Sequence, residues 1–502
     1  MKPPLPWTLD GKPFRILGGE LGNSAASHPR SLDPVWARLA SMGLNTVLVP
    51  VAWEQWEPEE GRFDFAHVDA LLDGARRHGL KLVPLWFGSW KNSMSCYVPS
   101  WVKRQPGRFP RARTKTGRYV EILSVFSDEN READRTAFAA LMAHLKRADR
   151  DQTVLMVQVE NEIGFLPDAR ESGAAADAAF AGPVPTELLA SLDARPAMIE
   201  PELLALRAAR TGSGTWAEVF GSGAQAEEVF QAWHYARYVE AVAAAGKAAF
   251  PVPLFVNAAL NRAHQRPGEY PSAGPLPHLI DVWKAGAPSV DLLSPDLYWG
   301  DFEQWCRRFD RGDNPLFIPE CGPGQANGAQ AFAVFGRHGA LGFCPFAIDS
   351  YGDADAVELK AAYGLLESLV PLLDAQRGRT AGALLTRGRR TSRLELGGYG
   401  ITVNHDHTLG WSPRSGEDTW PTAGCLIADL GDETYLVAGN GVVLNFDTAA
   451  AEAGIDVVEE GNFLDGEWVS SRRLCGDETH QGRHVRIPLG QWKAQKFRLY
   501  RY

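Results

Sequence analysis

Apolar runs that end abruptly in polar residues recur along the first three quarters of the chain. In one of them, residues 154–159 are apolar at nearly every position, and Glu160, Asn161 and Glu162 follow directly. A run of this kind is typical of a strand buried on both faces, as in a parallel sheet. Further strands are predicted at residues 14–20, 44–51, 80–86, 254–257, 290–298, 316–318 and 341–349.

Between these runs, apolar residues recur at the spacing of an α-helix. Asp33 and Pro34 are a suitable N-cap and first helical residue, and Trp36 and Leu39 begin an apolar stripe behind them. Alternating strands and helices are typical of a (β/α)8 TIM barrel, an α/β fold whose chemistry lies at the carboxyl ends of the strands. Further helices are predicted within residues 68–75, 127–147, 202–250 and 359–373.

From about residue 380 the pattern changes to short alternating segments separated by turn residues. Residues 392–396, 400–403 and 434–438 are examples. Such spacing predicts a smaller antiparallel β-sandwich or jelly-roll. We therefore expect a catalytic barrel over residues 1–378 and an accessory domain over residues 379–502, for which an interface role is favoured over sugar binding because no catalytic motif occurs there.

Two glutamates stand at the ends of separate predicted strands. Glu162 ends the polar cluster after residues 154–159, and Glu320 is the first charged residue after residues 316–318. A carboxylic acid that donates a proton at neutral pH usually works with a second carboxylate that has a different task. Two such residues can face each other across a barrel mouth, so we expect both to be catalytic.

The residues around Glu162 resemble a known family. The segment Gln-Val-Glu-Asn-Glu-Ile-Gly at residues 158–164 is similar to the Q-V-E-N-E-Y-G signature of glycoside hydrolase family 35, the β-galactosidases, and residues 53–65 are similar to its W-x-x-H-E-P-x-x-G-x-x-D-F motif. The resemblance spans roughly residues 14–370. It implies a retaining exo-acting β-galactosidase in which Glu162 is the acid/base and Glu320 the nucleophile.

The chemistry of glycoside cleavage sets the geometry that the two glutamates need. Carboxyl groups about 5 to 5.5 Å apart allow a covalent glycosyl-enzyme and retention, whereas about 6.5 to 9.5 Å leaves room for a water and inversion. We expect retention. We also expect partial burial and the charge of Glu320 to raise the pKa of Glu162.

The sequence departs from the family where the terminal sugar would be bound. Pro50, Trp56 and Ser89 stand where typical members carry Tyr, His and Glu, so the sugar identity does not transfer with the catalytic pair. Asn161 is expected to bind the sugar 2-hydroxyl. The other expected substrate contacts lie near strand ends: Glu20, Trp53, Glu54, Trp86, Trp90, Lys91, Asn257, Tyr298, Trp299 and Asp349.

Composition narrows the class of partner. The formal net charge of -10 argues against nucleic acid or an anionic membrane and is compatible with a neutral oligosaccharide or β-galactoside. The six cysteines show no paired spacing, and no cluster of His and Asp marks a metal site, so neither a cofactor nor a metal is expected. A homo-oligomer is compatible with the sequence.

No apolar run reaches the roughly 18 to 20 residues of a membrane span, and the first residues lack the apolar core of a secretory signal. As written, the chain is expected to be cytoplasmic. A signal removed upstream would make it periplasmic or secreted.

Three alternative functions stay open. An endo-β-glycanase on the same barrel would need an open groove, whereas we expect residues 165–200, which lack clear periodicity, to wall the active-site mouth. A non-catalytic carbohydrate-binding protein would not need both glutamates. A metal-dependent hydrolase is the weakest alternative, because the expected metal ligands are missing.

Overall fold

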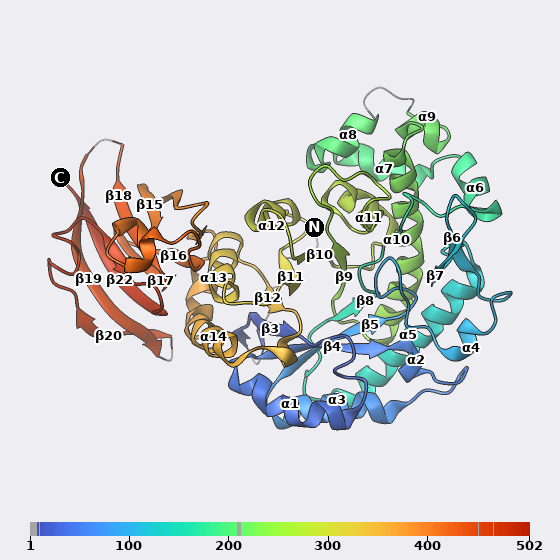
Figure 1. Cartoon of the computed structure of the whole chain (residues 1–502), viewed down its shortest axis with the longest axis horizontal. Coiled ribbons are helices and arrows are strands. Elements are labelled where there is room, and N and C mark those ends of the chain that lie inside the picture. Colours follow the sequence, from blue (N-terminus) through green and yellow to red (C-terminus); the bar gives the residue numbers. More distant parts are fainter. Residues whose placement is uncertain (1–7, 10, 208–211, 450, 465) are drawn as a thin grey trace.

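The first part of the chain folds as a closed parallel barrel (Figure 1). The computed structural model describes residues 8–9, 11–207, 212–449, 451–464 and 466–502. Eight parallel strands close into the barrel, which confirms the predicted fold class. They are β3 (Ile16–Glu20), β4 (Thr46–Ala52), β5 (Lys81–Phe87), β8 (Val157–Val159), β9 (Leu254–Ala259), β10 (Leu292–Leu297), β11 (Phe317–Cys321) and β12 (Gly342–Pro345).

Helices surround the barrel, and their ends follow from local capping. In α3 (Phe65–Arg77), Asp64 accepts hydrogen bonds from the first turn, and Val68, Leu71 and Leu72 are buried. The other large helices are α1 (Pro29–Ser41), α5 (Asp128–Ala148), α10 (Ala224–Ala249), α11 (Ile280–Gly286), α12 (Phe302–Phe309), α13 (Asn327–His338) and α14 (Asp353–Ala375).

Two helix predictions were wrong in their bounds. Helix α1 begins at Pro29 with His28 as its N-cap, so Pro34 lies inside the helix instead of at its first position. The helix expected over residues 202–250 is divided into α8 (Pro201–Arg207), α9 (Trp216–Phe220) and α10, because glycines at 212, 214, 221 and 223 interrupt it. Residues 208–211 of this segment lie outside the described residues.

The segment 165–200 is also more regular than expected. It contains α6 (Ala174–Ala181) and α7 (Thr186–Ala194), and α7 packs against α11 on the outside of the barrel. At its start, Phe165 forms a β-bridge with Ser272. None of the described helices combines the length and apolar character that a membrane crossing requires.

The C-terminal part contains two antiparallel sheets, as predicted. One has the strand order β13-β16-β17-β22-β19-β20 and the other β14-β15-β18-β21. Buried side chains such as Tyr399, Val437 and Phe497 form a core of their own between the sheets. The strands are β13 (Thr380–Leu385), β14 (Thr391–Leu396), β15 (Tyr399–His405), β16 (Ala423–Gly431), β17 (Thr434–Asn440), β18 (Val442–Asp447), β19 (Ala453–Leu464), β20 (Glu467–Arg473), β21 (Val485–Ile487) and β22 (Lys493–Arg501).

Helix α13 lies directly against the larger C-terminal sheet (Figure 1). A Cβ atom on Gly336 would lie 2.4 Å from the carbonyl oxygen of Ala381, and one on Gly382 would lie 2.2 Å from the carbonyl oxygen of Ala333. Only glycine permits so close an approach of helix and strand. Helix α13 follows β11, which carries Glu320, so the sheet packs on the helix next to that strand in the chain. The domain boundary at residues 378/379 stays a prediction.

Candidate active site

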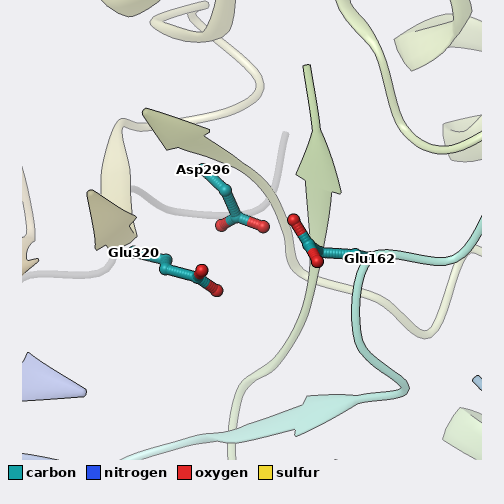
Figure 2. A group of neighbouring side chains, drawn as sticks. All are labelled: Glu162, Asp296 and Glu320. Carbon is teal, nitrogen blue, oxygen red and sulfur yellow. The ribbon is translucent and has the colours of Figure 1, made fainter. Parts of the chain in front are cut away.

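Three carboxyl groups meet at the carboxyl ends of the barrel strands. One oxygen atom each of Glu162, Asp296 and Glu320 lies within 4.8 Å of the other two (Figure 2). Asp296 of β10 is paired in register with Glu320 of β11, so both side chains point to the same face of the sheet. Glu162 reaches them from the loop after β8. With Glu20 at the end of β3, whose pKa is raised by the charges of Glu320 and Glu162, they form what is called here the carboxyl cluster.

The backbone around Glu162 is held in an unusual conformation. Glu160 and Glu162 have φ angles of 60° and 45°, a left-handed region that costs a residue other than glycine on the order of 1–3 kcal/mol. Asn257 holds the turn, because its Oδ1 accepts a hydrogen bond from the Glu162 amide at 2.9 Å and its Nδ2 donates to Asp296 at 2.7 Å. Strain of this kind is found at functional sites.

The same turn directs Glu160 away from the cluster. Its Oε2 accepts a hydrogen bond from the amide of Trp90 at 2.8 Å, and its carboxyl lies beside Asp134. Asp134 in turn accepts hydrogen bonds from Trp86 and Ser89 at 2.9 and 2.6 Å. Burial, and then the charge of Asp134, raises the pKa of Glu160 well above its usual range. These buried groups support the loop behind Glu162 and do not line the cluster.

The two catalytic candidates have different electrostatic surroundings. Burial and then the charge of Glu320 raise the pKa of Glu162 to about 7, while Lys91 acts in the opposite direction. Burial also raises the pKa of Glu320, but Lys91 and a hydrogen bond from Tyr298 favour its ionised form. At neutral pH this arrangement suits a protonated Glu162 beside an ionised Glu320.

Glu20 and Asp296 are more deeply enclosed. Burial raises the pKa of both well above the usual range, and the charges of Glu320 and Glu162 add to the effect. Among the described residues, neither carboxyl oxygen of Glu20 has a hydrogen-bond partner, and Oδ1 of Asp296 and Oε2 of Glu320 also lack one. Buried polar atoms normally have partners, so these oxygens are suited to bind the hydroxyl groups of a ligand.

Lys91 places a positive charge among these acids. Its side chain is only 5% exposed, and its ammonium group lies 4.9 Å from the centre of the Phe87 ring. Burial disfavours the charged form, but the summed charges of Glu320, Glu162, Glu20 and Asp296 outweigh it and raise the pKa of Lys91.

The spacing of Glu162, Asp296 and Glu320 would also permit a divalent cation. Hard cations favour such carboxylate oxygens as ligands. However, the Lys91 ammonium already places positive charge in the same group, and a second cation beside it would be repelled. The three carboxyl groups therefore fit a metal ion poorly. That the site uses no metal or other cofactor stays a prediction from the sequence.

Three of the predicted sugar-binding tryptophans are core residues, and those predictions were wrong. Trp53, Trp86 and Trp90 are all 0% exposed. The ring N–H of Trp53 donates a hydrogen bond to Glu57 at 2.8 Å, and that of Trp86 donates one to Asp134 at 2.9 Å. Trp90 packs edge-on against two buried tyrosines. Their rings fill space behind the strand ends and leave no face for a sugar.

The remaining predicted contacts are divided between the site and its surroundings. Asn161 is buried beside the cluster, where its Nδ2 donates to the Lys91 carbonyl at 2.7 Å and its Oδ1 accepts from Gln158 at 2.8 Å. Tyr298 contacts Glu320 directly. The Trp299 ring is 52% exposed next to Tyr298, and the Arg262 guanidinium lies 4.5 Å from its centre, so its predicted contact with a sugar stays a prediction.

Two predicted contacts have structural partners elsewhere. Asp349 accepts a hydrogen bond from the amide of Gly22 at 2.7 Å and so fixes the loop after β3. Glu54 forms an ion pair with Lys103 at 2.9 Å on the surface. Nothing in the described part of the chain links the Glu54 carboxyl to the cluster, and its predicted role has no structural support.

Asp296 is the cluster residue that the sequence pattern did not reveal. It stands within the apolar run of β10 (Leu-Leu-Ser-Pro-Asp-Leu) and is 1% exposed. The available signal was a single acid in an otherwise apolar strand, near its carboxyl end. In a barrel strand such a residue must point either into the barrel mouth or into the core, and burying a lone charge is costly.

Comparison with known proteins connects this geometry to a family. Residues 7–198 match the model of glycosyl hydrolases family 35, as the Gln158–Gly164 motif predicted, and residues 359–486 match a domain of unknown function, DUF5597. The first match contains Glu162 but ends before Glu320.

Curated relatives share part of this chain. Beta-galactosidase 13 of Arabidopsis thaliana is 31% identical over 134 residues, which are 23% of this chain and 15% of that protein. The beta-galactosidase of Xanthomonas manihotis is 27% identical over 166 residues, 32% of this chain and 25% of that protein. The matched part is thus a quarter or less of the length of either relative.

One solved structure is similar over nearly the whole chain. It is a catalytic mutant of a GH42 beta-galactosidase from G. stearothermophilus, with a TM-score of 0.56 and 11% sequence identity, and the match covers 97% of this chain and 98% of that one. At this identity the likeness supports the fold alone: a barrel followed by antiparallel sheets.

Proposed function

We propose that this protein is a glycoside hydrolase that releases terminal β-linked galactose from oligosaccharides with retention of configuration. Glu162 is the acid/base and Glu320 is the nucleophile. The match to glycosyl hydrolases family 35 and the relatives named beta-galactosidase support the activity and the sugar.

The spacing of the carboxyl groups is the observation that carries the mechanism. Oxygen atoms of Glu162 and Glu320 lie within 4.8 Å of each other. Retaining glycosidases place their two carboxyl groups about 5 to 5.5 Å apart, whereas inverting enzymes need about 6.5 to 9.5 Å for a water molecule. The observed spacing supports direct attack by a carboxylate on the sugar.

The reaction then takes two steps. In the first, a Glu320 oxygen bonds to the anomeric carbon while the bond to the leaving oxygen breaks, and Glu162 gives that oxygen its proton. In the second, Glu162 takes a proton from water, the water oxygen bonds to the anomeric carbon, and the ester to Glu320 breaks. Both glutamates return to their starting states.

The charge of Glu320 couples the two steps. While Glu320 is ionised it helps to raise the pKa of Glu162 to about 7, which keeps the acid protonated. Ester formation removes that charge, so the pKa of Glu162 falls and the group becomes a base when one is needed.

Hydroxyl recognition is assigned to the buried oxygens that lack protein partners. Oxygens of Glu20 and Asp296 accept hydrogen bonds from sugar hydroxyls. The Asn161 side chain, which lies beside them, binds the 2-hydroxyl, a contact that strengthens in the transition state.

A panel of 4-nitrophenyl glycosides tests the proposal. The β-galactoside should be the best substrate, and Glu320→Gln should reduce its turnover to background. The control Glu171→Gln alters another buried glutamate whose pKa is raised to about 7, outside the cluster, and should keep activity. Binding without any turnover would instead indicate a carbohydrate-binding protein, and internal cleavage of a polysaccharide would indicate an endo-glycanase.

Azide rescue tests the role of Glu162. The Glu162→Ala variant should form the glycosyl-enzyme from an activated nitrophenyl substrate but hydrolyse it slowly. Azide, which needs no base, should restore turnover and yield the β-galactosyl azide. An α-azide from this variant would reverse the two assignments.

A further inference from the structure

A cavity lies between the C-terminal part of the chain and the helices α13 and α14. Its volume is about 630 Å³. Gln325 and Ala326 form one wall, on the loop that runs from Glu320 to α13. His407, Trp420 and other residues of the C-terminal part form the opposite wall. The loop that carries the proposed nucleophile therefore also borders this cavity.

A buried polar group lines the cavity without a partner. His407 is 4% exposed, and its Nδ1 atom has no hydrogen-bond partner within the described ranges. Buried ring nitrogens of this kind normally have a partner, so a ligand hydroxyl would satisfy an unmet need. Asn440 is also present, with Oδ1 bound to the amide of Gly490 at 2.8 Å and Nδ2 donating one hydrogen to Glu358 at 3.2 Å.

The lining combines apolar surface with balanced charge. Trp420, Pro421 and Leu489 supply apolar surface of the kind that packs on the C–H faces of sugars. Asp406 and Arg486 neutralise each other through two hydrogen bonds of 2.6 and 3.2 Å.

The two other charged groups of the lining, Glu358 and Arg414, also have opposite signs. A cavity without net formal charge does not attract phosphates or nucleotides and suits a neutral ligand rich in hydroxyl groups.

We propose that this cavity is a second sugar-binding site that holds a neutral oligosaccharide outside the carboxyl cluster. The inference rests on the proposed function for its choice of ligand class. The cavity binds the non-reacting part of a long substrate, and it borders the loop that follows Glu320. Long substrates consequently gain affinity that a galactoside with a small leaving group does not.

Steady-state kinetics with two substrates tests the site. β-1,4-Galactotetraose is the long probe and 4-nitrophenyl β-galactoside the short one. His407→Phe keeps the ring volume and removes the unpartnered nitrogen, and Gln325→Trp fills the cavity from an exposed loop position. Each variant should raise KM for the tetrasaccharide about tenfold, the effect of losing one good contact, and leave kcat/KM for the short probe unchanged.

A control variant and a direct binding measurement distinguish failure of the second site from failure of the proposed function. Tyr502→Ala removes an aromatic ring that is 72% exposed and does not line the cavity. It should leave KM and kcat/KM unchanged for both substrates. Calorimetry with galactotetraose and the inactive Glu320→Gln protein, with and without His407→Phe, measures affinity without turnover. Equal affinities would overturn the second site even if the short probe is hydrolysed. Lack of hydrolysis of the short probe would instead count against the proposed function.

Discussion

The hydroxyl group of Tyr298 donates a hydrogen bond to Oε1 of Glu320 from the neighbouring strand end. Leu297 and Cys321 are paired in register, which brings the residues beside them together. Burial and then the charge of Glu320 raise the pKa of Tyr298, so the phenol keeps its proton and stays a donor throughout the working pH range. Together with Lys91 it favours the ionised form of Glu320.

Removing this donor should weaken Glu320 as a nucleophile. A hydrogen bond to a charged group contributes about 1.5–3 kcal/mol, so Tyr298→Phe should lower kcat about 10- to 100-fold. The acidic limb of the pH profile of kcat/KM should move to higher pH. Tyr270→Phe is the matched control, because Tyr270 donates to a different buried glutamate, Glu228, at 2.8 Å. Equal profiles for the two variants would show that the Tyr298 contact has no catalytic role.

The basic limb of the pH profile reports on Glu162. Its pKa is raised to about 7, so the proton needed for the first step is present below that pH and is lost as the pH rises through it. We expect kcat/KM to fall above about pH 7. In the Glu320→Gln protein the neighbouring charge is gone, and NMR titration of 13C-labelled glutamate should give a lower Glu162 pKa. An unchanged value would mean that the two carboxyls are not coupled.

Lys91 should affect the rate through its charge, although it neither donates the proton nor attacks the sugar. Lys91→Met removes the positive charge within the carboxyl cluster, so the pKa of Glu320 should rise further and activity at neutral pH should fall about tenfold or more. Lys103→Met removes a surface lysine that pairs with Glu54 and should leave the pH profile unchanged. Comparable profiles in both variants would argue against an electrostatic role for Lys91.

Loss of a buried tryptophan should lower the free energy of unfolding more than loss of an exposed one. Trp86→Ala removes a fully buried ring and its hydrogen bond to Asp134, and should lower the free energy of unfolding by about 3–5 kcal/mol. Trp299→Ala removes a half-exposed ring and should change it by no more than about 0.5 kcal/mol. Urea denaturation followed by fluorescence and circular dichroism measures both. Similar losses for the two variants would contradict the assignment of Trp86 to the core.

The order of strands and helices could be predicted from the sequence because it depends on local patterns. Continuous apolar runs with polar ends gave the barrel strands, and the structure brings Glu162 and Glu320, from two such ends, together. Side-chain direction could not be predicted in the same way. Successive residues of a strand point to opposite faces, so a shift of one residue decides whether Trp86 faces a ligand or the core.

The place of Asp296 in the carboxyl cluster could not be predicted from the sequence either. Its place in the cluster depends on its register with Glu320 on the neighbouring strand, and that pairing joins residues distant in the chain. The breaks between α8 and α10, by contrast, had a local signal in the glycines at 212, 214, 221 and 223. The cavity beside α13 could not be predicted either, since its walls come from both parts of the chain.

Covalent trapping tests the central claim most directly. Incubation with 2-deoxy-2-fluoro-β-D-galactosyl fluoride, followed by proteolysis and mass spectrometry, identifies the residue that bonds to the sugar. We predict a single label on Glu320, because Lys91 and Tyr298 favour the ionised form of its carboxylate and it lies close to the proton donor Glu162. A label on Asp296 or Glu162, or an inverted α-galactose product without any label, would contradict the account.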